Sequence, residues 1–403
     1  MRVLKVPGAL AFCIAGLIAR FGGAMTGIGI LMMASGIYGN YGIAGALTAA
    51  DVVAWAIGTA FLSNLVDRFG QRRIMLPAAL VSAAALAIVV ILAVFHAPLW
   101  TLFVFTVISG LTQGSPGAMV RARWNYVLSS AHDLHTAYSL ESTLDELGFI
   151  IGPVAATWLA TSLHPAAGLA GPALMIAGGA GVFYSLKSTE PTIITREHSH
   201  SHSRLIILLP GIAVVDAIGF LMGALFGSID VATLAATTTW NSREQVGIVL
   251  GVMSLGSAIG GFLYGARSWR SPLWKRFLIC VSLLGVTAWI LYFAWNPLTL
   301  GIFGFIVGFS IAPTFINANG LIGYLVPPAR LTEGLAWLGT AIGIGVSIGS
   351  AISGYLIDHF GHGAGFICVM VGGVLALSVA LGASKQLKIL TEAKSLGALG
   401  EDE

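Results

Sequence analysis

Long apolar stretches alternate with short polar segments along the whole chain. A helix needs about 20 apolar residues to cross a bilayer, and lipid offers no partners for unpaired backbone groups, so only helices that satisfy their own hydrogen bonds are expected there. Read at this length, the pattern predicts twelve membrane-spanning helices, near residues 8–35, 41–65, 74–95, 99–122, 137–163, 168–187, 206–236, 245–266, 276–295, 298–325, 332–357 and 364–384.

Composition agrees with this pattern. Hydrophobic residues make up 57% of the 403 residues and charged residues only 9%, whereas a soluble domain has about 25% charged residues. We therefore expect an all-α polytopic membrane protein.

The positive charges indicate the orientation. If the spans alternate in direction, all Lys and Arg residues except Arg20 and Arg243 fall on the side that holds both termini. Cytoplasmic loops retain positive charge, so both termini are expected in the cytoplasm, with the spans in the plasma membrane. The net charge of +3 then reflects topology and gives no reason to expect a nucleic-acid partner.

One polar segment, residues 188–204, divides the apolar pattern after the sixth span. Its composition, with Pro191 and alternating Ser and His, is typical of a flexible connector. We expect a six-helix bundle at 1–187, a cytoplasmic linker at 188–204, and a second six-helix bundle with a short cytoplasmic tail at 205–403.

The two halves also resemble each other. Offsetting one against the other aligns Gly148 and Gly152 of the fifth span with Gly345 and Gly349 of the eleventh. Each match is weak alone because glycine is common in this chain, but together they indicate a duplicated six-helix unit, as in one large class of transporters.

The loop between the second and third spans combines an acid, a glycine and several arginines. These residues are Asp67, Arg68, Gly70, Arg72 and Arg73. A carboxylate and arginines at two facing helix ends can form a charge-assisted clasp, and glycine permits the tight reversal between them. The loop resembles the signature of the major facilitator superfamily, with departures at Ser63, where the family has glycine, and at Gln71, where it has a basic residue.

This resemblance implies two pseudo-symmetric six-helix bundles that transport a small-molecule substrate across the lipid bilayer, with a monomer as the usual state and no enzyme activity. No cofactor is expected, because the chain has no Gly-x-x-x-x-Gly-Lys phosphate loop. No metal site is expected either, because all nine histidines lie outside the predicted spans.

The fifth span contains a second resemblance, to the family's antiporter motif, through Gly148, Gly152 and Pro153. Small residues four apart allow close helix contact, and proline kinks a helix. Ala155 and Ala156 replace the double glycine that usually follows. The motif favours export, and ordinary small-residue packing remains an alternative.

Polar side chains within the predicted spans are functional candidates, because ionisable groups there cost several kcal/mol unless they are paired or hydrated. The candidates for a proton or substrate pathway are Arg20, Asp51, Asp145, Asp216, Asp230, Asn317 and Asn319. Burial disfavours the charged form of a carboxyl group, so acids without a basic partner, such as Asp51 or Asp230, are the preferred proton carriers. Either acid can instead be structural, and the two amides can bind substrate or tie helices together.

The acids of the fifth span have different expected roles. Glu141, near the cytoplasmic end, is expected to form a structural ion pair with Arg121 and Arg123, which end the fourth span. Asp145 lies one turn deeper on the same face and can face Arg20, either as a structural pair or with a role in transport. Many exporters of the family carry an arginine within the fourth span where this chain has glycine, which leaves Arg20 as the substitute.

Three functions fit these features. The first is proton-coupled export of a small amphiphilic or drug-like molecule by alternating access, for which the apolar interior with few charges is the reason. The second is proton-coupled uptake of a sugar or small metabolite. A membrane sensor or enzyme that transports nothing is a remote third, because the chain lacks a catalytic constellation.

Overall fold

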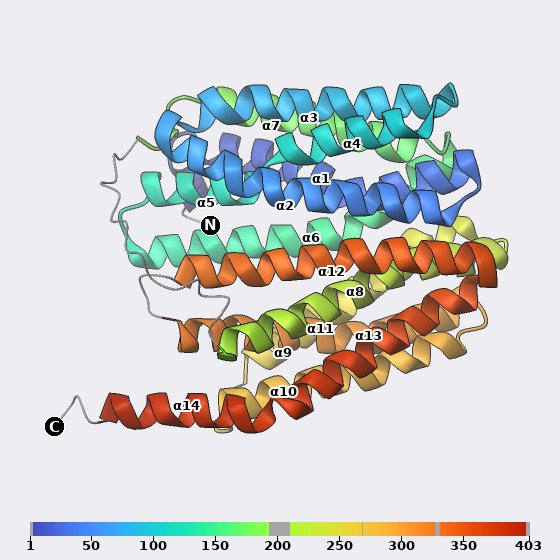
Figure 1. Ribbon diagram of the computed structural model, residues 1–403. Helices are drawn as coiled ribbons and strands as arrows, with labels where there is room; N and C mark the ends of the chain where they lie inside the picture. The colour runs from blue at the N-terminus through green and yellow to red at the C-terminus, as the bar shows by residue number, and fades with distance from the viewer. Residues whose placement is uncertain (1–2, 193–209, 268, 327–330, 400–403) are drawn as a thin grey trace. The chain divides into compact units, whose positions relative to one another are not determined.

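The computed structural model describes residues 3–192, 210–267, 269–326 and 331–399, and within these ranges the chain is helical, without strands. The long helices are shown in Figure 1. They are α1 (Ala9–Tyr38), α2 (Tyr41–Phe69), α3 (Gln71–Val94), α4 (Leu99–Gln113), α5 (Pro116–Val127), α6 (Ala131–Ser162), α7 (Ala167–Ser185), α8 (Pro210–Thr239), α9 (Val246–Gly265), α10 (Leu273–Thr287), α11 (Pro297–Leu325), α12 (Leu331–Phe360), α13 (His362–Gly382) and α14 (Ser384–Leu399).

The twelve-helix arrangement predicted from the apolar pattern is confirmed. In the described part of the chain, 10 helical segments are long and apolar enough to cross a membrane. The other two predicted spans correspond to α6, which carries several acids over its 32 residues, and to α4 and α5 together. Beyond the prediction, the ninth span ends in a 3₁₀ helix (Ala288–Phe293) and α14 follows the last span.

The fourth span is broken rather than continuous. Gly114 adopts φ +63° and ψ −157°, a conformation that only glycine adopts readily, and Pro116 opens α5 without a backbone N–H. The indole Nε1 of Trp55 donates to the carbonyl oxygen of Gly114 at 2.8 Å, which satisfies a group left free by the break. The predicted span 99–122 runs across this break, although residues 112–117 read Thr-Gln-Gly-Ser-Pro-Gly, a composition typical of a helix interruption.

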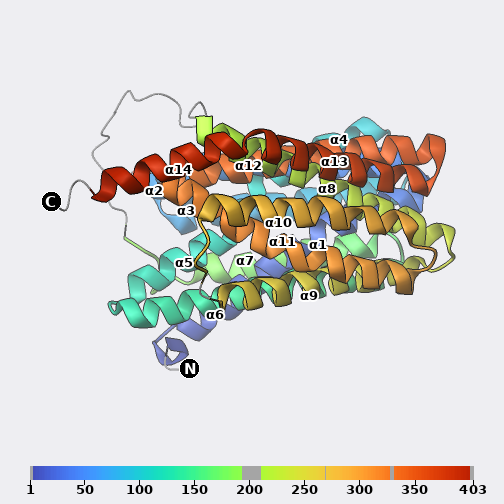
Figure 2. The ribbon, with the colours of Figure 1, turned by 90° about the horizontal axis from the view of Figure 1, so that it is seen from below.

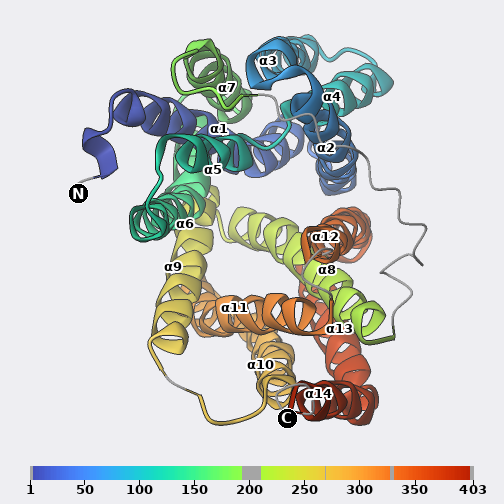
Figure 3. The same ribbon diagram turned by 90° about the vertical axis from the view of Figure 1, so that its left-hand side faces the viewer.

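The helices group into two compact units by their contacts. The first consists of Met1–Ser199 with Arg243–Gly251, and the second of His200–Ser242 with Val252–Glu403. In the first unit α1 packs against α7, α6 and α2, and in the second α8 packs against α12 and α13. Figures 2 and 3 show these neighbours from below and along the helices.

One of the two aligned glycine pairs, Gly152 and Gly349, packs in the same way in both halves. In the first unit, a methyl group at Gly152 of α6 would lie 3.2 Å from Cβ of Ala24 on α1. In the second, a methyl group at Gly349 of α12 would overlap the carbonyl oxygen of Ala224 on α8. Both contacts join the fifth helix of a half to its first helix, as expected for a duplicated unit.

The α8–α12 contact is the closer of the two and carries reciprocal hydrogen bonds. Ser228 donates to the carbonyl oxygen of Gly349 at 3.2 Å, and Ser350 donates to that of Gly227 at 3.2 Å. Small residues let the two backbones approach, and serine hydroxyls bond across the seam. In the second unit the fifth and first helices of the half are therefore joined by a close contact of small residues and serine hydrogen bonds.

Candidate functional site

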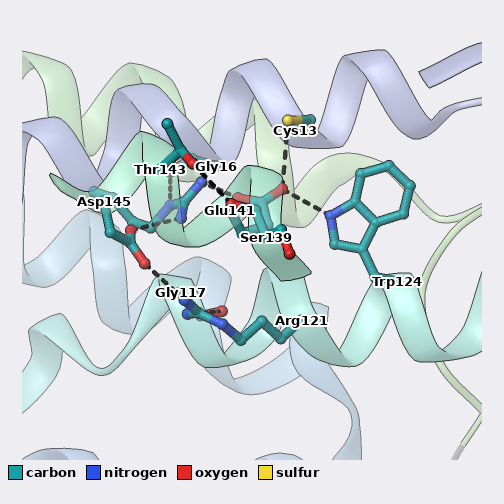
Figure 4. Close-up of polar contacts among 10 residues, drawn as sticks. Cys13, Gly16, Gly117, Arg121, Trp124, Ser139, Glu141, Thr143 and Asp145 are labelled. Atoms are coloured by element: carbon teal, nitrogen blue, oxygen red, sulfur yellow. Dashed lines mark hydrogen bonds and ion pairs between the residues drawn. The ribbon is translucent and has the colours of Figure 1, made fainter. Parts of the chain in front are cut away.

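A network of four charged side chains joins α1, α5 and α6 within the first unit. Arg20 donates through Nη1 to Asp145 Oδ1 at 2.6 Å and through Nη2 to Glu141 Oε2. Arg121 donates through Nη2 to Asp145 Oδ2 at 2.7 Å. Figure 4 shows Glu141 and Asp145 along α6, with Arg121 reaching Asp145 from α5. Two arginines and two acids are thus brought together between helices of the first unit.

Glu141 is the buried anchor of this network. Its carboxylate is fully buried and accepts hydrogen bonds from Trp124 Nε1 at 2.7 Å and from Cys13 Sγ at 3.4 Å, in addition to the Arg20 guanidinium. Three donors, two on α1 and one on α5, thus converge on this carboxylate. Glu141 therefore holds Arg20 in place.

Exposure increases from Glu141 towards the other end of the network. The side chain of Arg20 is 9% exposed, whereas those of Asp145 and Arg121 are 27% and 34% exposed. Asp145 is shared by both arginines through its two oxygens. Asp145 and Arg121 are therefore the members of the network that a polar ligand can reach.

The ion pair expected among Glu141, Arg121 and Arg123 is not formed, because Glu141 bonds to Arg20 instead. Residues two apart on a helix point about 200° apart, so Arg121 and Arg123 face different neighbours. Arg123 is fully buried, donates to Gln71 Oε1 at 3.0 Å and to Thr189 Oγ1 at 2.9 Å, and lies 4.1 Å from the centre of the Phe183 ring.

The hydrogen bond between Arg123 and Gln71 explains why glutamine stands where the family signature has a basic residue. Gln71 is 4% exposed and offers its carbonyl oxygen to Arg123, while its amide donates to the backbone oxygen of Met119 at 3.2 Å. A basic residue at position 71 would place a second cation against a buried guanidinium. Glutamine instead supplies the acceptor that Arg123 needs.

The signature loop turns tightly between α2 and α3. Gly70 has φ +88°, which fits the reversal between α2 and α3. Arg72 donates its backbone N–H to Glu190 Oε1 at 2.8 Å, and Arg73 lies over the ring of Phe69. Asp67, although exposed, forms no ion pair with any described residue. Arg68 lies in the last turn of α2.

The remaining acidic candidates stand apart from this network. Asp51 on α2 is 6% exposed and its Oδ1 has no hydrogen-bond partner among the described residues. Asp216 on α8 is 4% exposed, and neither of its carboxylate oxygens has a partner in the same described ranges. Asp230, also on α8, is partly buried.

The two amide candidates differ from each other. Asn317 is fully buried, donates to the carbonyl oxygen of Pro313 at 2.7 Å, and accepts from Tyr264 Oη at 2.9 Å. It therefore ties α9 to α11, which is the structural alternative considered for this amide. Asn319 is exposed.

The antiporter-like motif is only partly engaged in close packing. Gly152 meets α1, but a side chain at Gly148 would meet no other atom within 4 Å. Pro153 lies inside α6, which continues through it.

In the fourth span, a methyl group at Gly110 would lie 2.5 Å from the backbone oxygen of Asp51 and 2.8 Å from Cβ of Ala54. No arginine fits at position 110, so the exporters' arginine is excluded by close packing of α2 on α4.

Several residues of the site carry no signal that the sequence alone reveals. Trp124 and Cys13 look like ordinary apolar core residues until their donors are seen on Glu141. Thr189 and Glu190 lie at the start of the polar linker, where composition indicates only a connector.

Comparison with known proteins decides the family. The profile of the Major Facilitator Superfamily matches residues 12–229 and again 215–394. The chain belongs to this superfamily. In fold it is similar to the nucleoside transporter NupG, with a TM-score of 0.72 and 15% identity over 94% of this chain and 99% of that one.

It is also similar to an auto-inhibited peptide transporter of the POT family, with a TM-score of 0.68 and 11% identity over 95% of this chain and 97% of that one. No curated protein matches the sequence. The superfamily assignment makes the protein an integral membrane transporter, and at these identities the structural neighbours show only its fold.

Proposed function

We propose that this transporter is a proton-coupled exporter of a small amphiphilic molecule, and that Asp51 carries the coupling proton. The observation that supports this proposal is the buried carboxyl group of Asp51, which has an unpartnered oxygen and no ion pair among the described residues. An unpaired charge in an apolar interior costs several kcal/mol. A buried, protonated Asp51 and a hydrated, ionised Asp51 thus favour different conformations, which is what coupling requires.

Asp145 is a weaker candidate for the same role. Two guanidinium groups bond to the two oxygens of its carboxylate, so this acid is already paired. Asp216 resembles Asp51 in burial and in lacking partners, so it is the corresponding candidate in the second half. Asp230 remains a third candidate because it lies within α8 and is partly buried.

The broken fourth span supports substrate binding in the first unit. Discontinuous helices are typical of binding sites in transporters, and the break at Gly114 lies close to the charged network. A methyl group at Gly117, in the first turn of α5, would lie 3.2 Å from Arg121 Nη1 and 3.4 Å from Arg20 Cδ. The Gln113 amide approaches Gly23 of α1. A weakly polar ligand would find hydrogen-bonding groups here among mainly apolar helices.

Uptake by proton symport is the second candidate. The observation that favours it is Gly148, which has no close neighbour and so does not support the packing that the antiporter motif provides. Transporters named for nucleosides and peptides also share this fold.

Proton movement separates the two functions. Purified protein is placed in vesicles that contain a pH-sensitive dye, and candidate substrates found by thermal stabilisation are added outside. As substrate enters, an antiporter releases protons and the interior becomes alkaline, whereas a symporter acidifies it. We expect alkalinisation, and acidification would establish symport instead.

The role of Asp51 is tested in the same vesicles with Asp51→Asn, and with Asp133→Asn, near the start of α6, as the control. We expect Asp51→Asn to retain substrate exchange between the two sides and to lose accumulation driven by a pH gradient. The control should retain both. Undiminished gradient-driven accumulation by Asp51→Asn would remove this acid from the mechanism.

A further inference from the structure

Arg243 is one of the two basic residues that the charge distribution does not explain, and the structure gives it a specific contact. It opens a short 3₁₀ helix (Arg243–Gln245). Its Nη2 donates to the carbonyl oxygen of Met32 at 3.0 Å and to Ser35 Oγ at 2.7 Å, both near the C-terminal end of α1. Cations are favoured at that end of a helix, where carbonyl groups carry partial negative charge.

The end of α8 fixes the direction in which the chain presents Arg243. Asn241 adopts φ +52°, and its N–H donates to the carbonyl oxygen of Thr238 at 3.1 Å, while the N–H of Ser242 donates to that of Thr237 at 2.9 Å. This is the hydrogen-bond pattern of a Schellman cap, in which asparagine is one of the few residues that tolerate the left-handed position. Arg243 is therefore presented by a defined turn.

The residues after Arg243 pack against α6 of the same unit. A methyl group at Gly247 would lie 2.5 Å from the carbonyl oxygen of Pro153, and one at Gly251 would lie 3.0 Å from that of Ile150. Glycines four apart thus bring the first turns of α9 directly onto the α6 backbone. Segment 243–251 belongs to the first unit by its contacts, although it follows the first helix of the second half.

The end of α1 is tightly surrounded where Arg243 binds. A methyl group at Gly36 would lie 2.8 Å from Cβ of Pro165, in the connection between α6 and α7, and 3.3 Å from Arg243 Nη2. Arg243 therefore bonds to α1 at a point where the α6–α7 connection already confines that helix.

We propose that Arg243 is a positioning residue for the transport cycle, whose bonds to α1 must break for this end of the first unit to open. The end of α1 and the signature loop lie at opposite ends of α2, so the bonds lie at the end of the first unit remote from that loop. The proposal rests on alternating access by a transporter, and it depends on neither proton coupling nor the identity of the substrate.

Accessibility of a cysteine on α1 tests this role without any substrate. Gly27 is partly buried, a side chain there would meet no other atom within 4 Å, and it lies roughly 12 Å along α1 from Ser35 at 1.5 Å per residue. Gly27→Cys therefore reports opening without touching Arg243. In a Cys368→Ser background, labelling by a membrane-impermeant maleimide is compared with and without Arg243→Gln.

We expect Arg243→Gln to speed labelling about tenfold, which corresponds to ~1.4 kcal/mol, and Arg243→Lys to give an intermediate rate because it retains the charge. The matched control is Glu244→Gln, an exposed neighbour, which should leave the rate unchanged. If Arg243 has only a structural role, Arg243→Gln lowers the melting temperature but leaves the labelling rate unchanged at temperatures well below melting. That result would overturn the proposal. So would equal rates in the Gln, Lys and wild-type proteins. Labelling is measured without a proton gradient, so a failure of proton coupling at Asp51 would not affect this result.

Discussion

The most direct energetic test of the charged network is the substitution Glu141→Gln. The carboxylate is fully buried and accepts from the Trp124 indole, the Cys13 thiol and the Arg20 guanidinium. Glutamine retains one acceptor oxygen for Trp124, but it removes the charge and turns an amide N–H towards Arg20. Breaking a buried ion pair by removing one partner costs about 3–5 kcal/mol.

The structure favours the lower end of that range. Arg20 is 9% exposed and keeps Asp145 as a second partner at 2.6 Å, so its charge is not left wholly unpaired. We expect Glu141→Gln to lower the free energy of unfolding by about 3 kcal/mol. Asp145→Asn, at the more exposed end of the same network, is the matched control and should cost about 1 kcal/mol or less.

The assay is reversible unfolding of the purified protein in mixed micelles with an increasing fraction of denaturing detergent, followed by tryptophan fluorescence. A double-mutant cycle with Arg20→Met isolates the pair, because removing both charges leaves neither unpaired. We expect the double variant to be more stable than the sum of the single effects predicts by about 2 kcal/mol. Additive effects, within about 0.5 kcal/mol, would refute the assignment of Glu141 as the anchor of Arg20.

Three further substitutions test the packing and hydrogen bonds described above. Gly349→Ala should destabilise the protein by about 1–3 kcal/mol, because its methyl group overlaps the α8 backbone, whereas Gly339→Ala, which meets nothing within 4 Å, should be close to neutral in the same unfolding assay. Gln71→Arg restores the basic residue of the family signature but faces buried Arg123, so we expect a loss of about 2 kcal/mol and a lower melting temperature. Tyr264→Phe removes a hydroxyl that donates to a buried amide of α11, and calorimetry should show a loss of about 1 kcal/mol.

The sequence predicts the spans well because bilayer thickness sets their length and hydropathy sets their position. It misses the break at Gly114, because the span at 99–122 is set by its length, although Gln113, Ser115 and Pro116 around the glycine are typical of a helix interruption. It also misses α14, which lies beyond the apolar pattern.

Side-chain partners are less predictable than spans. The meeting of Arg20 with Asp145 could be anticipated from depth and helical periodicity. The pairing of Glu141 could not, because the choice between two arginines of α5 and one of α1 depends on how those helices are rotated. The sequence also does not explain why Gly110 stands where many exporters of the family have an arginine. The explanation comes from the close packing of α2 on α4 at this position.

The placement of segment 243–251 has a consequence for biosynthesis. This stretch completes the first unit, yet it leaves the ribosome only after the linker and the whole of α8 have been made. Until then the part of α6 around Pro153 lacks its contacts with Gly247 and Gly251 of α9. A gene cut within the linker would therefore yield a first polypeptide that lacks segment 243–251 and needs the second polypeptide in the same membrane to supply it.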